Sequence, residues 1–118
     1  MTTCSKKATS RKEKSSLVNL IYCIASSITD GKCVIERSWL GQYYEANKYT
    51  VDISNFAQKP SEIINSIKSS LVKKGGRLEN VTGLGKMVVM PNECGVFIEE
   101  RFDVHNQSSI HIHVLGNI

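Results

Sequence analysis

The chain has 118 residues, of which 41% are hydrophobic and 22% are charged. This length suits one domain with a modest core, and the apolar fraction excludes a fully disordered chain. The net charge of +4 resides in residues 1–14, because residues 15–118 carry ten Lys and Arg against ten Asp and Glu. No apolar run approaches the roughly 20 residues of a membrane-spanning helix, so we expect no membrane partner.

The segment before residue 16 is rich in Lys, Ser and Thr and has no apolar periodicity. We therefore expect residues 1–15 to form a disordered basic tail and residues 16–118 to form a single globular domain. A mobile cationic arm commonly contacts a polyanion, although a purely solubilising tail has the same composition. The cations of the tail are Lys6, Lys7, Arg11, Lys12 and Lys14.

The apolar stretch 17–25 resembles the core of a secretory signal, but Asn19 interrupts it and the preceding basic region is unusually long. The four cysteines show no C-x-x-C pair and no regular spacing. Neither a zinc site nor a disulfide framework is therefore indicated. These features together favour reduced thiols and a cytoplasmic protein.

Apolar residues recur at helical spacing after the tail and predict a first helix over residues 16–29, which Asp30-Gly31 ends. Residues 32–37 are compatible with a short strand. Residues 38–47 favour a short helix with Ser38 as its N-cap. Three aromatic side chains would crowd one side of that helix, as core packing or as a partner-binding patch: Trp39, Tyr43 and Tyr44.

A further long helix is predicted over residues 60–74, after a strand at 50–54. Pro60 occupies its first turn and Gly75-Gly76 ends it. Its buried stripe is expected to consist of Ile63, Ile64, Ile67, Leu71 and Val72.

Beyond residue 76 the hydrophobic period changes from helical to alternating, which predicts four strands. These strands cover residues 77–81, 86–90, 95–104 and 108–115. We therefore expect an α+β fold, in which two to three N-terminal helices pack on a C-terminal antiparallel β-meander of three to five strands.

The order of the elements in residues 16–90 resembles a winged helix, with helix 60–74 as the recognition helix and the following hairpin as the wing. This resemblance implies phosphate contacts from a run of cations that only Glu79 opposes. Those cations are Lys68, Lys73, Lys74, Arg77 and Lys86. The alternative is an ordinary α+β domain whose lysines form a solvated helix end.

The only spacing typical of a metal site is His111-Ile-His113. Residues two apart on a strand project from the same face, so the two imidazoles can bind a transition metal together. Cys94, Asp103 and His105 are the residues that might complete such a site. The alternative is a half-buried strand with its polar residues outside.

No motif indicates a cofactor or a catalytic centre. The sequence Gly83-Leu-Gly85-Lys86 does not fit a Walker loop, because position 80 is Asn and position 87 is Met. Catalysis by a histidine with Ser or Cys requires a spatial proximity that a sequence does not show, and Cys94 is only a candidate thiol. We therefore expect a non-enzymatic protein without a cofactor.

Charge dominates the functional prediction. The tail and the cationic run from Lys68 to Lys86 together favour a small, regulatory nucleic-acid-binding protein. The alternative is an adaptor or inhibitor that binds a protein partner, or a second copy of itself, through a sheet edge or through the aromatic patch.

Overall fold

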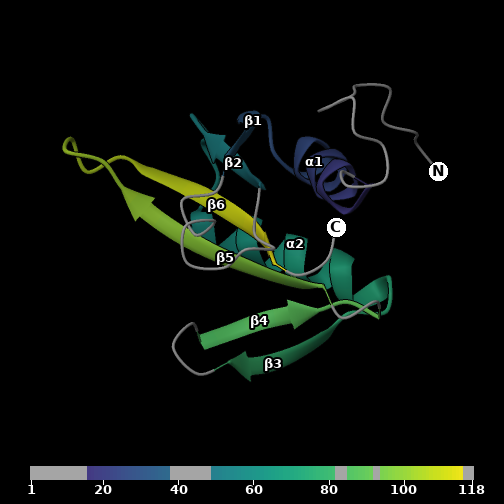
Figure 1. Ribbon diagram of the computed structural model, residues 1–118. Coiled ribbons are helices and arrows are strands. Elements are labelled where there is room, and N and C mark those ends of the chain that lie inside the picture. Colours follow the sequence, from purple (N-terminus) through teal and green to yellow (C-terminus); the bar gives the residue numbers. More distant parts are fainter. Residues whose placement is uncertain (1–15, 38–48, 82–84, 92–93, 116–118) are drawn as a thin grey trace.

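The computed structural model describes residues 16–37, 49–81, 85–91 and 94–115. Within this part of the chain there are two helices and six strands (Figure 1). The helices are α1 (Ser16–Ile28) and α2 (Pro60–Lys73). The strands are β1 (Lys32–Arg37), β2 (Tyr49–Ser54), β3 (Arg77–Val81), β4 (Gly85–Val89), β5 (Gly95–Phe102) and β6 (Ser108–Leu115). The predicted tail 1–15 and helix 38–47 lie outside the described residues.

The six strands form one antiparallel sheet in the order β1-β2-β6-β5-β4-β3. Strands β3 to β6 are sequential neighbours, so the predicted C-terminal meander is confirmed. The β1–β2 hairpin extends this meander by pairing β2 with β6, as in the pair Asp52 and His111. The α+β class is therefore confirmed, with six strands in place of the three to five expected.

The winged-helix arrangement suggested for residues 16–90 is not the arrangement of the described residues. The β3–β4 hairpin is no separate wing, because β4 pairs with β5 inside the same sheet. It also lies at the opposite end of that sheet from β1 and β2. The apolar alternation of β5 and β6 accounts for this outcome, since two such strands need partners that a winged helix does not provide.

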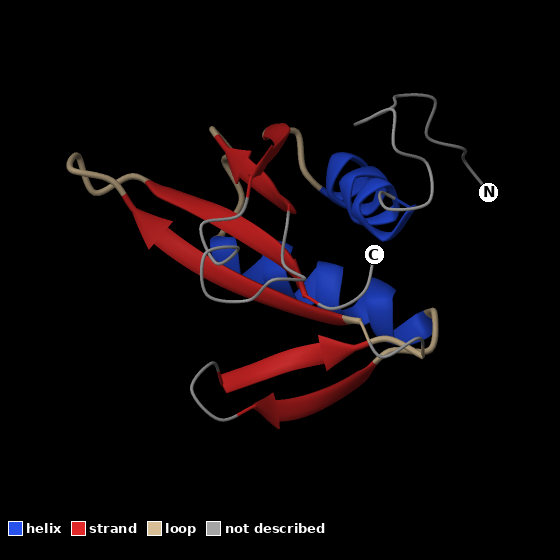
Figure 2. Ribbon diagram, viewed as in Figure 1, coloured by secondary structure: helices blue, strands red, loops and turns tan. Residues whose placement is uncertain are grey.

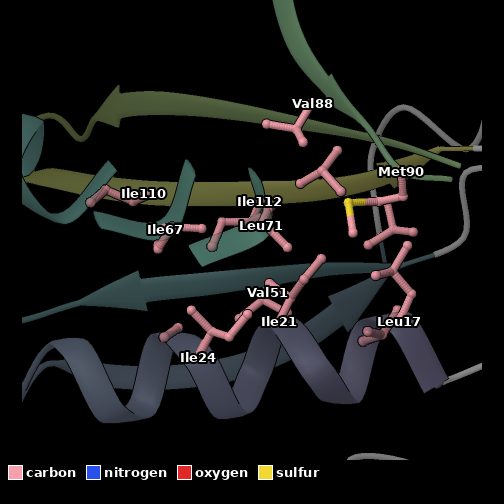
Figure 3. Close-up of a cluster of buried hydrophobic side chains, with 14 of the residues drawn as sticks. Leu17, Ile21, Ile24, Val51, Ile67, Leu71, Val88, Met90, Ile110 and Ile112 are labelled. Atoms are coloured by element: carbon pink, nitrogen blue, oxygen red, sulfur yellow. The ribbon is translucent and has the colours of Figure 1, made fainter. Parts of the chain in front are cut away.

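Both helices cover one face of the sheet (Figures 1 and 2). Helix α1 packs on β1 and β2, α2 packs on β6 and β4, and the two helices also contact each other. Figure 3 shows the apolar side chains of the helices and of the inner sheet face meeting in one core. The inner face contributes Val51, Ile53, Val88, Val96, Ile110, Ile112 and Val114.

Helix α2 begins and ends where the sequence predicts. Pro60 stands in its first turn, and the N–H of Gly76 donates to the carbonyl oxygen of Leu71 while that of Gly75 donates to Val72. This pair of bonds is a Schellman motif, with Gly75 at φ 101°. Val72 is 43% exposed instead of buried, because it lies about 100° around the helix from Leu71. Neither described helix has the length and apolar character to cross a membrane.

Candidate functional site

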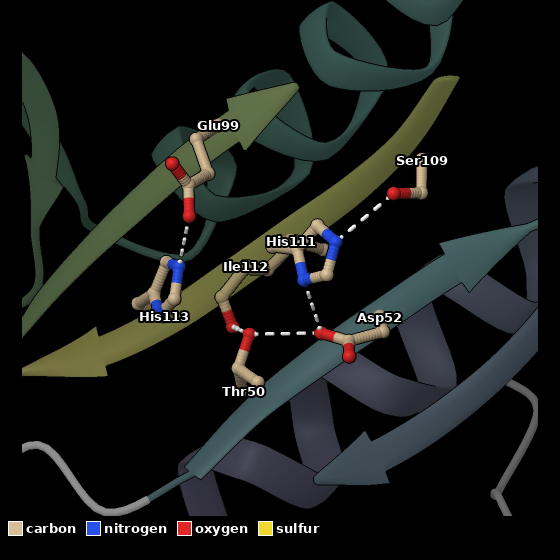
Figure 4. A network of polar contacts seen from close by, with 7 residues as sticks. All are labelled: Thr50, Asp52, Glu99, Ser109, His111, Ile112 and His113. Atoms are coloured by element: carbon tan, nitrogen blue, oxygen red, sulfur yellow. Dashed lines mark hydrogen bonds and ion pairs between the residues drawn. The ribbon is translucent and has the colours of Figure 1, made fainter. Parts of the chain in front are cut away.

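The sheet face turned away from α1 and α2 carries a connected set of polar side chains (Figure 4). On β6, His111 and His113 alternate with buried isoleucines, so both imidazoles project from this face, as predicted. Their ring centroids lie 6.4 Å apart. Strand pairing then places Asp52 of β2 and Glu99 of β5 on either side of His111.

Both ring nitrogens of His111 have hydrogen-bonding partners. Nδ1 lies 2.9 Å from Oδ1 of Asp52, and Nε2 lies 3.0 Å from Oγ of Ser109. The hydroxyl oxygen of Thr50 is 3.2 Å from the same Asp52 oxygen and 3.0 Å from the carbonyl oxygen of Ile112. The side chains of His111 and Asp52 are 18% and 24% exposed, so solvent reaches this chain of contacts.

His113 belongs to a drier part of the same face. Its side chain is fully buried, stacks on Phe97 with ring centroids 5.8 Å apart, and places Nε2 2.7 Å from Oε2 of Glu99. Burial lowers the pKa of His113, while the hydrogen bond and negative charge of Glu99 oppose this effect without reversing it. The imidazole is therefore neutral at neutral pH, and its Nε2–H donates to the carboxylate of Glu99.

The described residues do not assemble a metal centre around these histidines. No group of three or more His, Cys, Asp or Glu side chains in this part of the chain is placed to hold a metal ion. Cys94, Asp103 and His105 therefore do not complete the pair. The nitrogens of His111 are instead engaged by Asp52 and Ser109, two residues that the sequence interpretation did not single out.

An open pocket of about 270 Å³ lies beside His111. Its walls come from alternate residues of β1, together with residues of β2 and β6. The lining includes Lys32, Val34, Glu36, Asp52, Ser109 and His111. Alternation along a strand places such residues on one face, which is the only signal in the sequence for this pocket.

The predicted cations of the domain lie at the other end of the sheet, on the C-terminal half of α2 and on the β3–β4 hairpin. Arg77 forms an ion pair with Glu79. Lys73, Lys74 and Lys86 are exposed, and no ion pair involves them within the described ranges. Residues 68–86 carry five cations against one carboxylate, whereas the rest of 15–118 carries five against nine. Positive and negative charges are thus segregated along the domain.

The cysteines differ in part from expectation. Cys33 and Cys94 are thiols that form no disulfide bond, and burial raises the pKa of both. Cys94 is therefore protonated at neutral pH and is a poor nucleophile. Cys23 is disulfide-bonded, so the expectation of reduced thiols is wrong for this residue.

The cations of the tail and the aromatic patch of Trp39, Tyr43 and Tyr44 lie outside the described residues. Protein-family models, curated proteins and solved structures were all compared with this chain, and none matches it.

Proposed function

We propose that the protein binds nucleic acid through its basic end, in a regulatory role that is non-enzymatic with respect to the nucleic acid. The basic end consists of Lys68, Lys73, Lys74, Arg77 and Lys86. The segregation of charge supports this proposal most directly. The lysines of the basic end stand in a segment with one opposing carboxylate, while the remainder of the domain has an acidic excess. A surface that carries mainly positive charges attracts a polyanion, because few carboxylates are present to repel it.

Lysine suits sequence-independent contact with phosphate, because its ammonium is a flexible point charge. Lys73 lies in the last turn of α2 and Lys74 caps it, so both extend from an element that the core holds in place. Arg77 contributes less free charge, since Glu79 is its ion-pair partner. Binding of this kind releases counterions and weakens steeply with salt.

The test is the salt dependence of affinity for a DNA duplex, measured for the native protein and for Lys73→Ala/Lys74→Ala. Each lost duplex contact should reduce the slope of log K against log salt by about 0.9, so the double variant should reduce it by about 1.8. Lys59→Ala is the matched control, because Lys59 is the N-cap at the other end of the same helix. Equal slopes for the double variant and the native protein would contradict the proposal.

A protein partner is the second candidate, and exposed apolar residues favour it. Strand β3 is the last strand of the sheet, so its outer edge has no partner strand among the described residues. Leu78 of β3 is 51% exposed and Val72 of α2 is 43% exposed. Together with the nearby lysines, this edge suits an extended segment that is both acidic and apolar.

The two candidates differ in their dependence on Leu78. Binding to phosphate needs no apolar side chain, so Leu78→Ser should leave duplex affinity and its salt slope unchanged. A peptide that alternates Glu with Val is the probe for the second candidate. The second candidate would replace the first if the native protein binds this peptide saturably and does not bind duplex. Leu78→Ser should then abolish binding of the peptide.

A further inference from the structure

We propose that Ser109, His111 and Asp52 form a site that accepts acyl groups, with Ser109 as nucleophile and His111 as general base. The site lies on the outer face at the β1–β2–β6 side of the sheet, away from the basic end, and does not depend on the nucleic-acid proposal. Figure 4 shows the three side chains in one line of contacts, from the Ser109 hydroxyl through the imidazole to the carboxylate.

The order of atoms in this line is the one that activates a serine hydroxyl. Asp52 lies at Nδ1 of His111, 2.9 Å away, and Ser109 lies at Nε2, 3.0 Å away. A carboxylate at Nδ1 fixes the proton there, which leaves the lone pair of Nε2 directed at the hydroxyl hydrogen. The same carboxylate stabilises the imidazolium that forms once His111 has taken that proton.

Asp52 is held in this position from two directions. Its strand is in register with β6, where Asp52 pairs directly with His111. The Thr50 hydroxyl lies 3.2 Å from the carboxylate oxygen that contacts the imidazole. We therefore assign Asp52 as a positioning residue, because it acts on the nucleophile only through His111.

The pocket beside these residues indicates the class of substrate. All three residues line it, and its volume of about 270 Å³ lies below the range typical of drug-sized ligands. A short acyl group such as acetyl fits this space, with Val34 as an apolar wall. Lys32 lines the same pocket and supplies a positive charge for the oxyanion that forms during acyl transfer. The substrates are therefore esters of short-chain acids.

The reaction balances without a further reactant. The Ser109 hydroxyl transfers its proton to Nε2 of His111 while Oγ attacks the ester carbonyl carbon. The tetrahedral intermediate then expels the leaving group and acyl-Ser109 remains. An alkoxide takes the proton from His111, whereas a phenolate leaves as the anion and His111 releases its proton to solvent, so His111 is neutral again in both cases. Hydrolysis reverses these roles, since a water gives its proton to His111, attacks the acyl carbon and restores the serine hydroxyl.

The experiment uses p-nitrophenyl acetate with the full chain. Release of p-nitrophenolate gives the rate, and peptide mass spectrometry locates the acetyl group on the native protein. We expect acetylation of Ser109, and a rate of acetylation at Ser109 at least about 100-fold lower in His111→Gln, because a general base contributes this much or more. Two matched controls should keep the native rate: Ser108→Ala, the preceding serine of β6, and His105→Gln, an exposed histidine beyond β5.

Asp52→Asn tests the positioning role. We expect it to lower the acetylation rate and to change the dependence of that rate on pH, while the thermal unfolding midpoint records any loss of structure. Native protein in which peptide mapping finds no acetyl group on Ser109 would overturn the proposal, and this result needs no variant to fold. Native acetylation rates at Ser109 in folded His111→Gln would also overturn it.

Discussion

The side chain of His113 lies on the outer face of the sheet and is fully buried there. The pattern on β6 correctly places His113 on the same face as His111, but it does not show that His113 is fully buried against Phe97 and Glu99. Those partners come from β5, and their register with β6 is a tertiary property. His113, which resembles a metal ligand in the sequence, is therefore a neutral hydrogen-bond donor to the carboxylate of Glu99.

This burial predicts a dependence of stability on pH. The unfolded chain titrates His113 near its ordinary pKa of 6.5, and burial lowers the pKa in the folded state. Below pH 6.5 the unfolded state therefore binds more protons than the folded state, so the free energy of unfolding falls as the pH falls. The charges of Glu99 and Asp52 moderate this loss, and a positive charge on His111 adds to it.

The measurement is urea denaturation from about pH 7.5 to about pH 5.5. One proton contributes at most about 1.4 kcal/mol per pH unit, and His113→Gln should remove this contribution while retaining a donor for Glu99. His105→Gln is the control, because it makes the same replacement at an exposed histidine. An unchanged profile in His113→Gln would assign the pH dependence to other groups.

Helix and strand limits follow from local chemistry more than from the rest of the chain. The proline at the start of α2 and the glycine pair at its end act within a few residues, and both limits are predicted to within one residue. The turn-bounded strands β3 and β6 match their predicted ranges for the same reason. The exposure of Val72 is not predicted by local chemistry, because it depends on which side of α2 meets the sheet.

The conformation of Gly75 at the end of α2 is one such local feature, and its contribution to stability can be measured. Its φ of 101° lies in the left-handed region, and an added Cβ would lie 2.9 Å from Cγ of Pro91. Gly75→Ala should lower the free energy of unfolding by about 1–2 kcal/mol, measured by urea denaturation. Ser69→Ala, at an exposed position inside the same helix, should change it little or raise it slightly. Equal free energies of unfolding for the two variants would show that the left-handed conformation of Gly75 contributes nothing to stability.

The arrangement of the whole molecule is the part that the sequence predicts least. The α+β class and the meander follow from the change in hydrophobic period, but the docking of β1–β2 onto β6 does not. That docking brings Asp52 to His111 although the two residues are far apart in the chain. Long-range pairing depends on the total of buried surface and satisfied backbone groups, and no local pattern records it.

The charge of residues 2–14 leads to a prediction for the whole molecule. Residues 2–14 carry five cations and one carboxylate, and the domain has its own basic end. Protein comprising residues 15–118 should therefore bind duplex more weakly and with a flatter salt slope than the full chain. It should retain the part of the slope that Lys73 and Lys74 contribute, so Lys73→Ala/Lys74→Ala should flatten its slope further. Retention on heparin at two salt concentrations provides the comparison. Identical retention of both proteins would show that the tail makes no contact.

The segregation of charge also gives the domain an electric dipole moment. Its positive pole lies at the β3–β4 side of the sheet, because residues 68–86 carry five cations against one carboxylate while the rest of 15–118 carries five against nine. In the field of a polyanion such a domain rotates before contact, so that the β3 edge arrives first. The pocket beside His111 then faces bulk solvent, and a small molecule can reach it while the opposite edge is occupied.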